Sequence, residues 1–175
     1  MTEAAGASVH ASAVLVGNRA VLIRGPSGAG KSRLAFDLIL AGRSGQIPKA
    51  VLVGDDRVHL DTAGEEIVVR PAAELAGLIE IRGLGIRRCE FAGAAIVGLV
   101  VDLGAADAER LPPPETLITR IFGAIIPRIP IGAGHAPLPL VVAALTTTES
   151  SSSVNLSGDC VKGIGNHISP TIATE

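Results

Sequence analysis

The stretch Gly25–Ser32 reads GPSGAGKS and matches the Walker A pattern G-x-x-x-x-G-K-S. Glycines in such a loop let successive backbone N–H groups point at phosphate oxygens, and the helix that follows adds positive potential from its amino terminus. The lysine reaches the outer phosphates, and the serine hydroxyl coordinates Mg2+. The sequence therefore predicts that the phosphates of a nucleotide or of pyrophosphate bind to a phosphate loop made of Gly25, Pro26, Ser27, Gly28, Ala29, Gly30, Lys31 and Ser32.

Two adjacent carboxylates, Asp55 and Asp56, follow the apolar run 50–53. Phosphoryl transfer to a hydroxyl group needs a carboxylate near the transferred phosphate to accept the proton, and Mg2+ prefers oxygen ligands. One carboxylate of the pair can bind Mg2+ while the other accepts the proton, and the sequence leaves open which one is the base. The competing interpretation is a solvated Asp-Asp turn with no part in chemistry.

The spacing of apolar residues predicts the elements that position these groups. Six apolar runs are expected to form strands, of which the first two and the fourth and fifth pair as hairpins: residues 13–16, 20–24, 50–53, 58–60, 67–69 and 96–103. Helical spacing from Leu34 to Ala41 predicts a helix after the phosphate loop that ends at Gly42. The prolines 112–114 predict an exposed connection. The aspartate pair thus follows a strand, at the edge where open sheets bind their ligands.

Composition excludes several classes of protein. A chain of 175 residues fits one compact domain, and 47% hydrophobic residues without Trp or Tyr predict an aliphatic core. A formal net charge of -2 gives no general attraction to nucleic acid or to anionic membranes. The run 129–148 has no Asp, Glu, Lys or Arg, but three prolines and two glycines favour buried strand and loop over a membrane span. Cys89 and Cys160 form no metal or disulfide pattern, and without an export signal we expect a cytoplasmic protein.

Two further motifs resemble those of a known family. The segment 53–58, VGDDRV, followed by 79–86, IEIRGLGI, is similar to HPr kinase/phosphorylase, and the resemblance covers residues 10 to 145. Members of this family phosphorylate a serine of the phosphocarrier protein HPr with ATP or pyrophosphate and reverse the reaction by phosphorolysis. The resemblance implies an α/β fold, with a P-loop-containing mixed sheet and flanking helices like that of HPr kinases and phosphoenolpyruvate carboxykinases. It also implies a homo-oligomer, specifically a hexamer.

The resemblance assigns roles to residues outside the phosphate loop. His10 stands twenty-one residues before Lys31, which is the spacing of the family's active-site histidine. Glu80 corresponds to the glutamate that binds Mg2+ together with the loop serine, and Arg110 corresponds to the catalytic arginine of a mobile segment. If residues 80–82 are extended, Arg82 shares a face with Glu80 and can bind phosphate there. Without the resemblance, His10 and Arg110 read as surface residues, and Glu80 with Arg82 as a surface ion pair.

The sequence also departs from the family's pattern. His135 takes the place of the arginine in the family's P-V-x-x-G-R stretch, so we expect weaker phosphorolysis with kinase activity retained. Residues 43–49 lengthen a surface connection, and the sequence begins nine residues before His10, so we expect none of the amino-terminal domain that many members carry. We expect residues 1–145 to form the catalytic domain. Residues 146–175 are expected to be a polar, disordered tail in place of the family's helical tail.

Two other functions compete with this hypothesis. In the first, the chain is a P-loop small-molecule kinase, and Asp102 at the end of the run 96–103 is its Walker B aspartate for Mg2+. In the second, the chain is a regulatory module that binds a nucleotide without catalysis. The guanine-binding pattern Asn-Lys-x-Asp is missing from the sequence, which argues against a GTPase.

Overall fold

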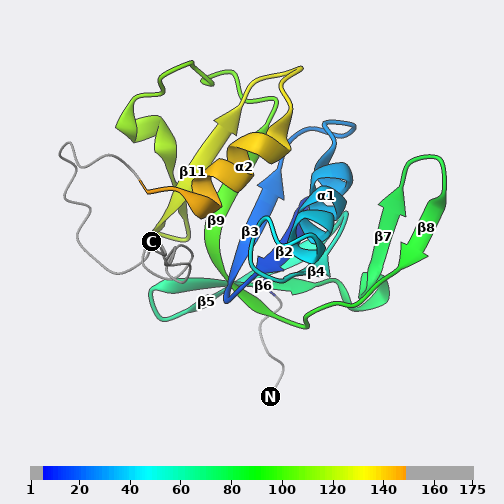
Figure 1. Ribbon diagram of the computed structural model, residues 1–175. Helices are drawn as coiled ribbons and strands as arrows, with labels where there is room; N and C mark the ends of the chain where they lie inside the picture. Colours follow the sequence, from blue (N-terminus) through cyan, green and yellow to red (C-terminus); the bar gives the residue numbers. More distant parts are fainter. Residues whose placement is uncertain (1–5, 149–175) are drawn as a thin grey trace, which may run out of the picture.

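The structure is a computed structural model that describes residues 6–148 as one nine-stranded sheet, a separate two-stranded hairpin and two α-helices (Figure 1). The helices are α1 (Lys31–Arg43) and α2 (Pro137–Thr146), and two 3-10 helices span Ala73–Leu75 and Pro114–Leu117. The strands are β1 (Ala7–Val9), β2 (Ser12–Val16), β3 (Arg19–Arg24), β4 (Ala50–Gly54), β5 (Val58–Ala63), β6 (Glu66–Pro71), β7 (Leu78–Ile81), β8 (Gly85–Arg88), β9 (Ala95–Leu103), β10 (Ile118–Ile121) and β11 (Ala124–Ile131). Neither α-helix in this part of the chain has the length and apolar character of a membrane-crossing helix.

The order of the strands brings several carboxyl ends to one edge of the sheet. The sheet runs β1-β5-β6-β9-β3-β2-β4, and β11 pairs with both β9 and β10. β3, β9 and β11 are mutually parallel, and the other pairings are antiparallel. Because β3 and β4 are both antiparallel to β2, they point the same way. The carboxyl ends of β3, β4, β9 and β11 therefore share one edge, where the loops that bind ligands in such sheets are found.

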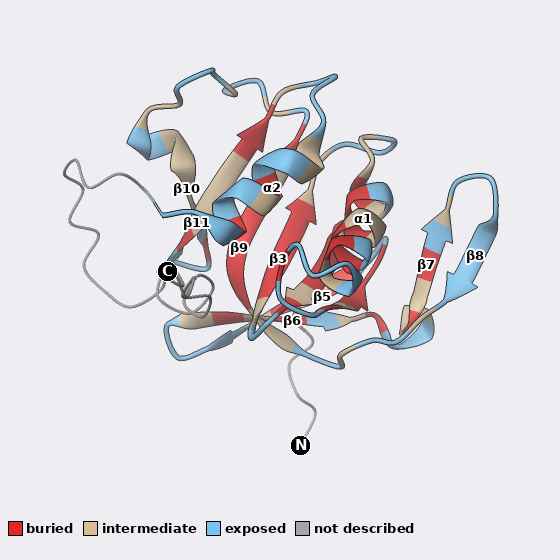
Figure 2. Cartoon of the chain, in the orientation of Figure 1, coloured by how far each residue is buried: buried red, intermediate tan, exposed pale blue. Residues whose placement is uncertain are grey.

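Each face of the sheet has its own aliphatic core. On β3, Val21 and Ile23 face α1 and α2, while Ala20 and Leu22 face the opposite side, as the two-residue period of a strand requires. Both helices lie on the same face, in front of the sheet in Figure 1. The opposite core is closed by residues of β5, β6 and β10. Figure 2 shows the buried positions concentrated along the central strands and the inner side of α1. The expected aliphatic core is confirmed.

Most of the predicted elements are confirmed, with small shifts at their ends. The two hairpins are β2–β3 and β5–β6, and the other two runs are β4 and β9. The first strand is β1, so His10 lies in a bend between two strands and not before the first one. The helix ends at Arg43, one residue beyond the expected stop at Gly42. A Cβ atom at Gly42 would lie 2.7 Å from the backbone nitrogen of Ala50, so the glycine permits close packing of α1 on β4.

The expectation of strand and loop across residues 129–148 is wrong in its second half. β11 ends at Ile131, and α2 begins at Pro137. Prolines at the first turn of a helix remove N–H groups that would have no helical partner, so Pro137 and Pro139 do not break the helix. Val141 and Leu145, four residues apart, are buried against the sheet. The disorder expected for residues 146–175 concerns positions that, from 149 onward, lie outside the described residues.

Candidate functional site

Five segments with polar or glycine-rich sequence meet at the edge of the sheet defined by the carboxyl ends of β3, β4, β9 and β11. They are the entry to β2 at residues 10–12, the phosphate loop after β3, the aspartate pair after β4, residues 104–113 after β9 and residues 132–136 after β11. Most of the residues singled out in the sequence lie in these segments, although 12 to 47 residues separate one segment from the next. The topology of the sheet therefore assembles one candidate site.

The backbone of the phosphate loop depends on its glycines. Gly25, Gly28 and Gly30 have φ angles of 147°, 78° and 96°, in the region that side chains with a Cβ atom rarely adopt. At Gly25 a Cβ atom would also lie 2.8 Å from the carbonyl oxygen of Leu103. At Gly28 and Gly30 a Cβ atom would meet open space, so the backbone angle is what requires glycine there. The loop thus packs against the end of β9 and turns directly into α1.

Lys31 is fixed across the phosphate loop. Its Nζ atom donates hydrogen bonds to the carbonyl oxygens of Gly25 and Pro26, at 3.0 and 3.1 Å, and the residue is 6% exposed. Ser32 follows in the first turn of α1, half-buried, beside N–H groups that have no helical acceptor. An ammonium group and a helix amino terminus at one loop form a site for a phosphate anion.

A cavity of about 360 Å³ lies beside the phosphate loop. It is lined by residues 26–29, 103–104, 131–135 and 137. His135 therefore lines the same cavity as the phosphate loop, and its backbone N–H donates to the carbonyl oxygen of Gly132 at 3.2 Å. A smaller cavity of about 120 Å³ lies at the other end of α1, between Arg43, Lys49 and Cys89, away from the phosphate loop. Of these two cavities, the larger one adjoins the phosphate loop.

Asp55 is a buried carboxylate with a partner on each oxygen. Only 3% of the residue is exposed. Its Oδ1 accepts a hydrogen bond of 2.5 Å from Oγ of Ser12, a residue with 0% exposure, and its Oδ2 accepts one of 3.1 Å from the backbone N–H of Glu80. A buried carboxylate needs such donors because it has lost its hydration. Asp55 thereby ties β2 and β7 to the carboxyl end of β4.

Asp56 lies in a different environment, although it is the next residue. Its side chain is 64% exposed and lies 3.3 Å from Nδ1 of His10. Its φ angle is 65°, and the N–H of Arg57 donates to the carbonyl oxygen of Asp55 at 2.7 Å, which closes a tight turn around Asp56. A non-glycine residue in such a turn is strained, a feature that recurs at functional sites. The turn leaves the Asp56 carboxylate accessible from solvent beside His10.

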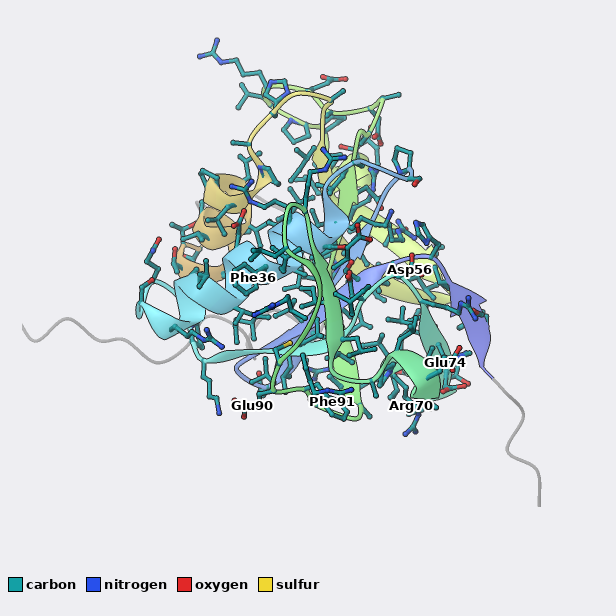
Figure 3. All side chains as sticks on the ribbon, turned by 90° about the vertical axis from the view of Figure 1, so that its right-hand side faces the viewer. Phe36, Asp56, Arg70, Glu74, Glu90 and Phe91 are labelled. Carbon is teal, nitrogen blue, oxygen red and sulfur yellow. The ribbon has the colours of Figure 1, made fainter. Side chains whose placement is uncertain are left out.

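Glu80 and Arg82 lie on the β7–β8 hairpin, which stands apart from the large sheet (Figure 1). In the view of Figure 3 the hairpin runs between Phe36 of α1 and Asp56. Glu80 is exposed on β7, but Arg82 lies in the turn, so the extended path that would place the two side chains on one face is not present. Gly83, with a φ angle of 90°, permits this tight turn. Within residues 6–148 no group of three or more His, Cys, Asp or Glu side chains could hold a metal ion.

Asp102 is bound by two arginines. Its carboxylate accepts two hydrogen bonds from Arg24, of 2.7 and 2.8 Å, and one of 2.5 Å from Nε of Arg128. Burial raises the pKa of Asp102, but the hydrogen bonds from Arg24 and Arg128 outweigh it, so the pKa lies below its ordinary value. Both oxygens face guanidinium groups, which is a poor arrangement for a metal ligand. The geometry therefore argues against Asp102 as a Walker B aspartate.

Several partners of these groups carry no motif of their own. Ser12 could have been noticed as the one polar residue in the apolar run 11–16, but nothing in the sequence pairs it with Asp55. The same holds for Arg24, at the end of β3, and for Arg128, within β11, which read as ordinary charged residues. Arg110 lies exposed in the connection between β9 and β10, outside the regular elements, as expected.

Several known proteins with similar sequences are HPr kinase/phosphorylases. The profile of the HPr Serine kinase C-terminal domain matches residues 2–153. An HPr kinase/phosphorylase of Prosthecochloris aestuarii is 35% identical over 139 residues, which cover 71% of this chain and 38% of that protein. An HPr kinase/phosphorylase of Mycoplasma mycoides subsp. mycoides is 40% identical over 80 residues, which cover 46% of this chain and 23% of that protein. The chain thus spans less than half the length of these relatives.

A solved structure agrees with this result. The Hpr(Ser) kinase/phosphatase from Coxiella burnetii is similar in fold with a TM-score of 0.62 and 26% identity, over 78% of this chain and 91% of that chain. The expected α/β fold with a mixed sheet is confirmed by this similarity and by the pairing of the strands. Because the family profile covers most of the 175 residues, the chain belongs to the family of the HPr serine kinase C-terminal domain.

Proposed function

We propose that the chain transfers a phosphoryl group from ATP or pyrophosphate, with Mg2+, to a serine of the phosphocarrier protein HPr, and removes it again by phosphorolysis. The observation that carries the proposal is the phosphate loop, in which Lys31 crosses to Gly25 and Pro26 at the sheet edge that also holds Asp55 and Asp56. Membership of the family and the names of the relatives supply the acceptor.

The two aspartates take different parts in this proposal. A general base must be reachable by the acceptor hydroxyl. Asp56 is exposed and paired with His10, whereas both oxygens of Asp55 already accept hydrogen bonds. We therefore propose Asp56 as the base, His10 as the group that orients it, and Asp55 as a positioning residue for Glu80.

The remaining groups are proposed to bind the donor and the metal. The Ser32 hydroxyl and the Glu80 carboxylate are oxygen donors, the type that Mg2+ prefers, so these residues fit the ion. The bound ion would neutralise charge on the donor phosphates. The phosphate loop binds the polyphosphate, and Arg82 and Arg110 stabilise the charge that develops during transfer.

Small-molecule kinase activity is the second candidate, and the contacts of Asp102 disfavour it. A Walker B aspartate has to offer an oxygen to the metal, but both oxygens of Asp102 are bound by guanidinium groups. A module that binds a nucleotide without catalysis would have no use for the strained, exposed Asp56 beside His10. The family resemblance further supports a cytoplasmic homo-oligomer, and the net charge of -2 supports the absence of nucleic-acid and membrane partners.

The test is direct phosphorylation of HPr. The purified chain is incubated with HPr, Mg2+ and either ATP or pyrophosphate, and phosphoserine is detected by mass spectrometry, before and after addition of inorganic phosphate. Lys31→Ala should abolish transfer, while Arg33→Ala, which removes an exposed cation paired with Asp37 on the same helix, should leave it intact. Unmodified HPr with both donors would refute the proposal.

A further inference from the structure

Arg128 contacts both ends of the connection between β9 and β10. Its Nη1 and Nη2 atoms donate to the carboxylate of Asp107 at 2.7 and 3.0 Å, and Nη1 also donates to the carbonyl oxygen of Thr116 at 2.9 Å. Asp107 lies four residues after the end of β9, and Thr116 lies two residues before the start of β10. A single guanidinium group thus holds the connection at Asp107 and at Thr116. Between these two contacts lie residues 108–115, which Arg128 does not bind.

The same guanidinium group is itself fixed. The side chain of Arg128 is 13% exposed, and its Nε atom donates to Asp102, which also binds Arg24. Arg24 is the residue directly before Gly25. The consecutive ion pairs Arg24–Asp102, Asp102–Arg128 and Arg128–Asp107 therefore link the start of the phosphate loop to the connection between β9 and β10. Its hydrogen bonds to Asp107, and then to Asp102, raise the pKa of Arg128 above its ordinary value, so the cation is present at any working pH.

Residues 108–115, here called the Arg110 segment, have little regular structure or burial that would fix their position. They contain no strand and only the start of the 3-10 helix at Pro114, and most of their side chains are at least partly exposed. Pro112 and Pro113 restrict the backbone, so fixing both ends of this short segment restricts where Arg110 can go.

We propose that Arg128 and Asp107 are positioning residues that hold Arg110 within reach of the phosphate loop. Arg128 bridges the connection at Asp107 and Thr116, and Asp102 joins that bridge to Arg24 and hence to the loop. The kinetic part of this inference rests on the proposed function, because it assigns Arg110 to phosphoryl transfer. The bridge itself can be tested without any activity.

The first experiment measures cleavage by trypsin after Arg110 in the folded full chain, by mass spectrometry of the fragments. Asp107→Asn should accelerate this cut at least about tenfold, because segments released from their contacts are cleaved faster. The matched control is Glu66→Gln, which weakens the Arg19–Glu66 ion pair of similar length and exposure at the other end of β3 from Arg24. Equal cleavage of the two variants would overturn the proposal.

The second experiment is a double-mutant cycle on phosphoryl transfer. Asp107→Asn should lower kcat by about 100-fold, the effect of misplacing one group, with KM for ATP changed less than about twofold. Asp107→Glu, which keeps a carboxylate, should retain part of the kcat that Asp107→Asn loses. The control Glu66→Gln should have the kcat of the unaltered chain. In an Arg110→Ala background, Asp107→Asn should cause no further loss of kcat.

The outcomes separate the two proposals. If Asp107→Asn lowers kcat as much without Arg110 as with it, the residue does not act through Arg110 and the positioning proposal fails. If the unaltered chain transfers no phosphate, the proposed function fails, while the cleavage after Arg110 still decides whether Arg128 and Asp107 hold the segment.

Discussion

Ser12 donates a 2.5 Å hydrogen bond from its Oγ to Oδ1 of Asp55, although the two lie 43 positions apart in the sequence. The Oδ2 atom of the same carboxylate accepts from the backbone N–H of Glu80. One buried side chain therefore joins the start of β2, the end of β4 and the hairpin strand β7. The position of Glu80 relative to the phosphate loop depends on this contact, so the contact links the stability of the fold to the candidate site.

Ser12→Ala should lower the free energy of unfolding by about 1.5–3 kcal/mol, because it removes a buried hydrogen bond to a charged group. Urea denaturation at neutral pH measures the change. Ser8→Ala, at an exposed position of β1, is the matched control and should be close to neutral. A loss for Ser12→Ala no larger than that of the control would mean that the hydroxyl contributes little to the stability of the fold.

Asp56→Asn should reduce phosphoryl transfer by about 10²–10⁴-fold with little change in Tm, because the side chain is exposed and the turn tolerates asparagine. Initial rates with HPr measure the effect, and Asp37→Asn on α1 controls for the lost charge. If Asp55→Asn abolished transfer in a folded protein while Asp56→Asn kept most of it, Asp55 would be the base instead.

Local patterns were sufficient to predict the centre of the site. The phosphate loop, the hairpin before it and the helix after it depend on residues close together in sequence, such as the glycines 25, 28 and 30 and the apolar positions from Leu34 to Ala41. The helix α2 replaces part of the strand and loop expected for residues 129–148, because Pro137 and Pro139 lie in its first turn, where proline is compatible with a helix. The partners of Asp55 and Asp102 were missed because those contacts join distant strands, and no periodicity records them.

Removal of the Asp102 carboxylate should destabilise the fold in a pH-dependent way. Asp102→Asn should lower the free energy of unfolding by about 1.5–3 kcal/mol at neutral pH, since two arginines lose their charged acceptor. Because the folded state lowers the pKa of Asp102, the unfolded chain binds the proton more readily, and stability from this group is lost as the pH falls through its folded pKa.

The difference in the free energy of unfolding between the unaltered chain and Asp102→Asn should therefore be largest above about pH 5. It should shrink as the pH falls below the ordinary aspartate pKa of about 3.9. Urea denaturation at a series of pH values measures it. Transfer rates of the folded variant should fall no more than those of Asp107→Asn, because Asp102 belongs to the same bridge. Parallel pH profiles for the two proteins would show that the pair with Arg24 and Arg128 stabilises nothing.

His135→Arg should increase phosphorolysis. His135 lines the cavity beside the phosphate loop, and an arginine there would offer a planar fork of N–H donors to inorganic phosphate. We expect KM for inorganic phosphate to fall about tenfold or more, with the forward transfer from ATP changed little, because the added donors would face the cavity beside the phosphate loop. Formation of pyrophosphate from phosphoseryl-HPr and inorganic phosphate, followed at increasing phosphate concentration, measures the gain.

His135→Lys is the informative control, because it adds a cation without the fork. If geometry matters, lysine should recover only part of the gain, whereas equal gains would mean that charge alone limits phosphate binding at this wall of the cavity. The backbone contact from His135 to the carbonyl oxygen of Gly132 is kept in both variants, so the loop conformation should not change. If neither cation lowered KM for phosphate, the cavity beside the phosphate loop would not be where the phosphorolytic phosphate binds.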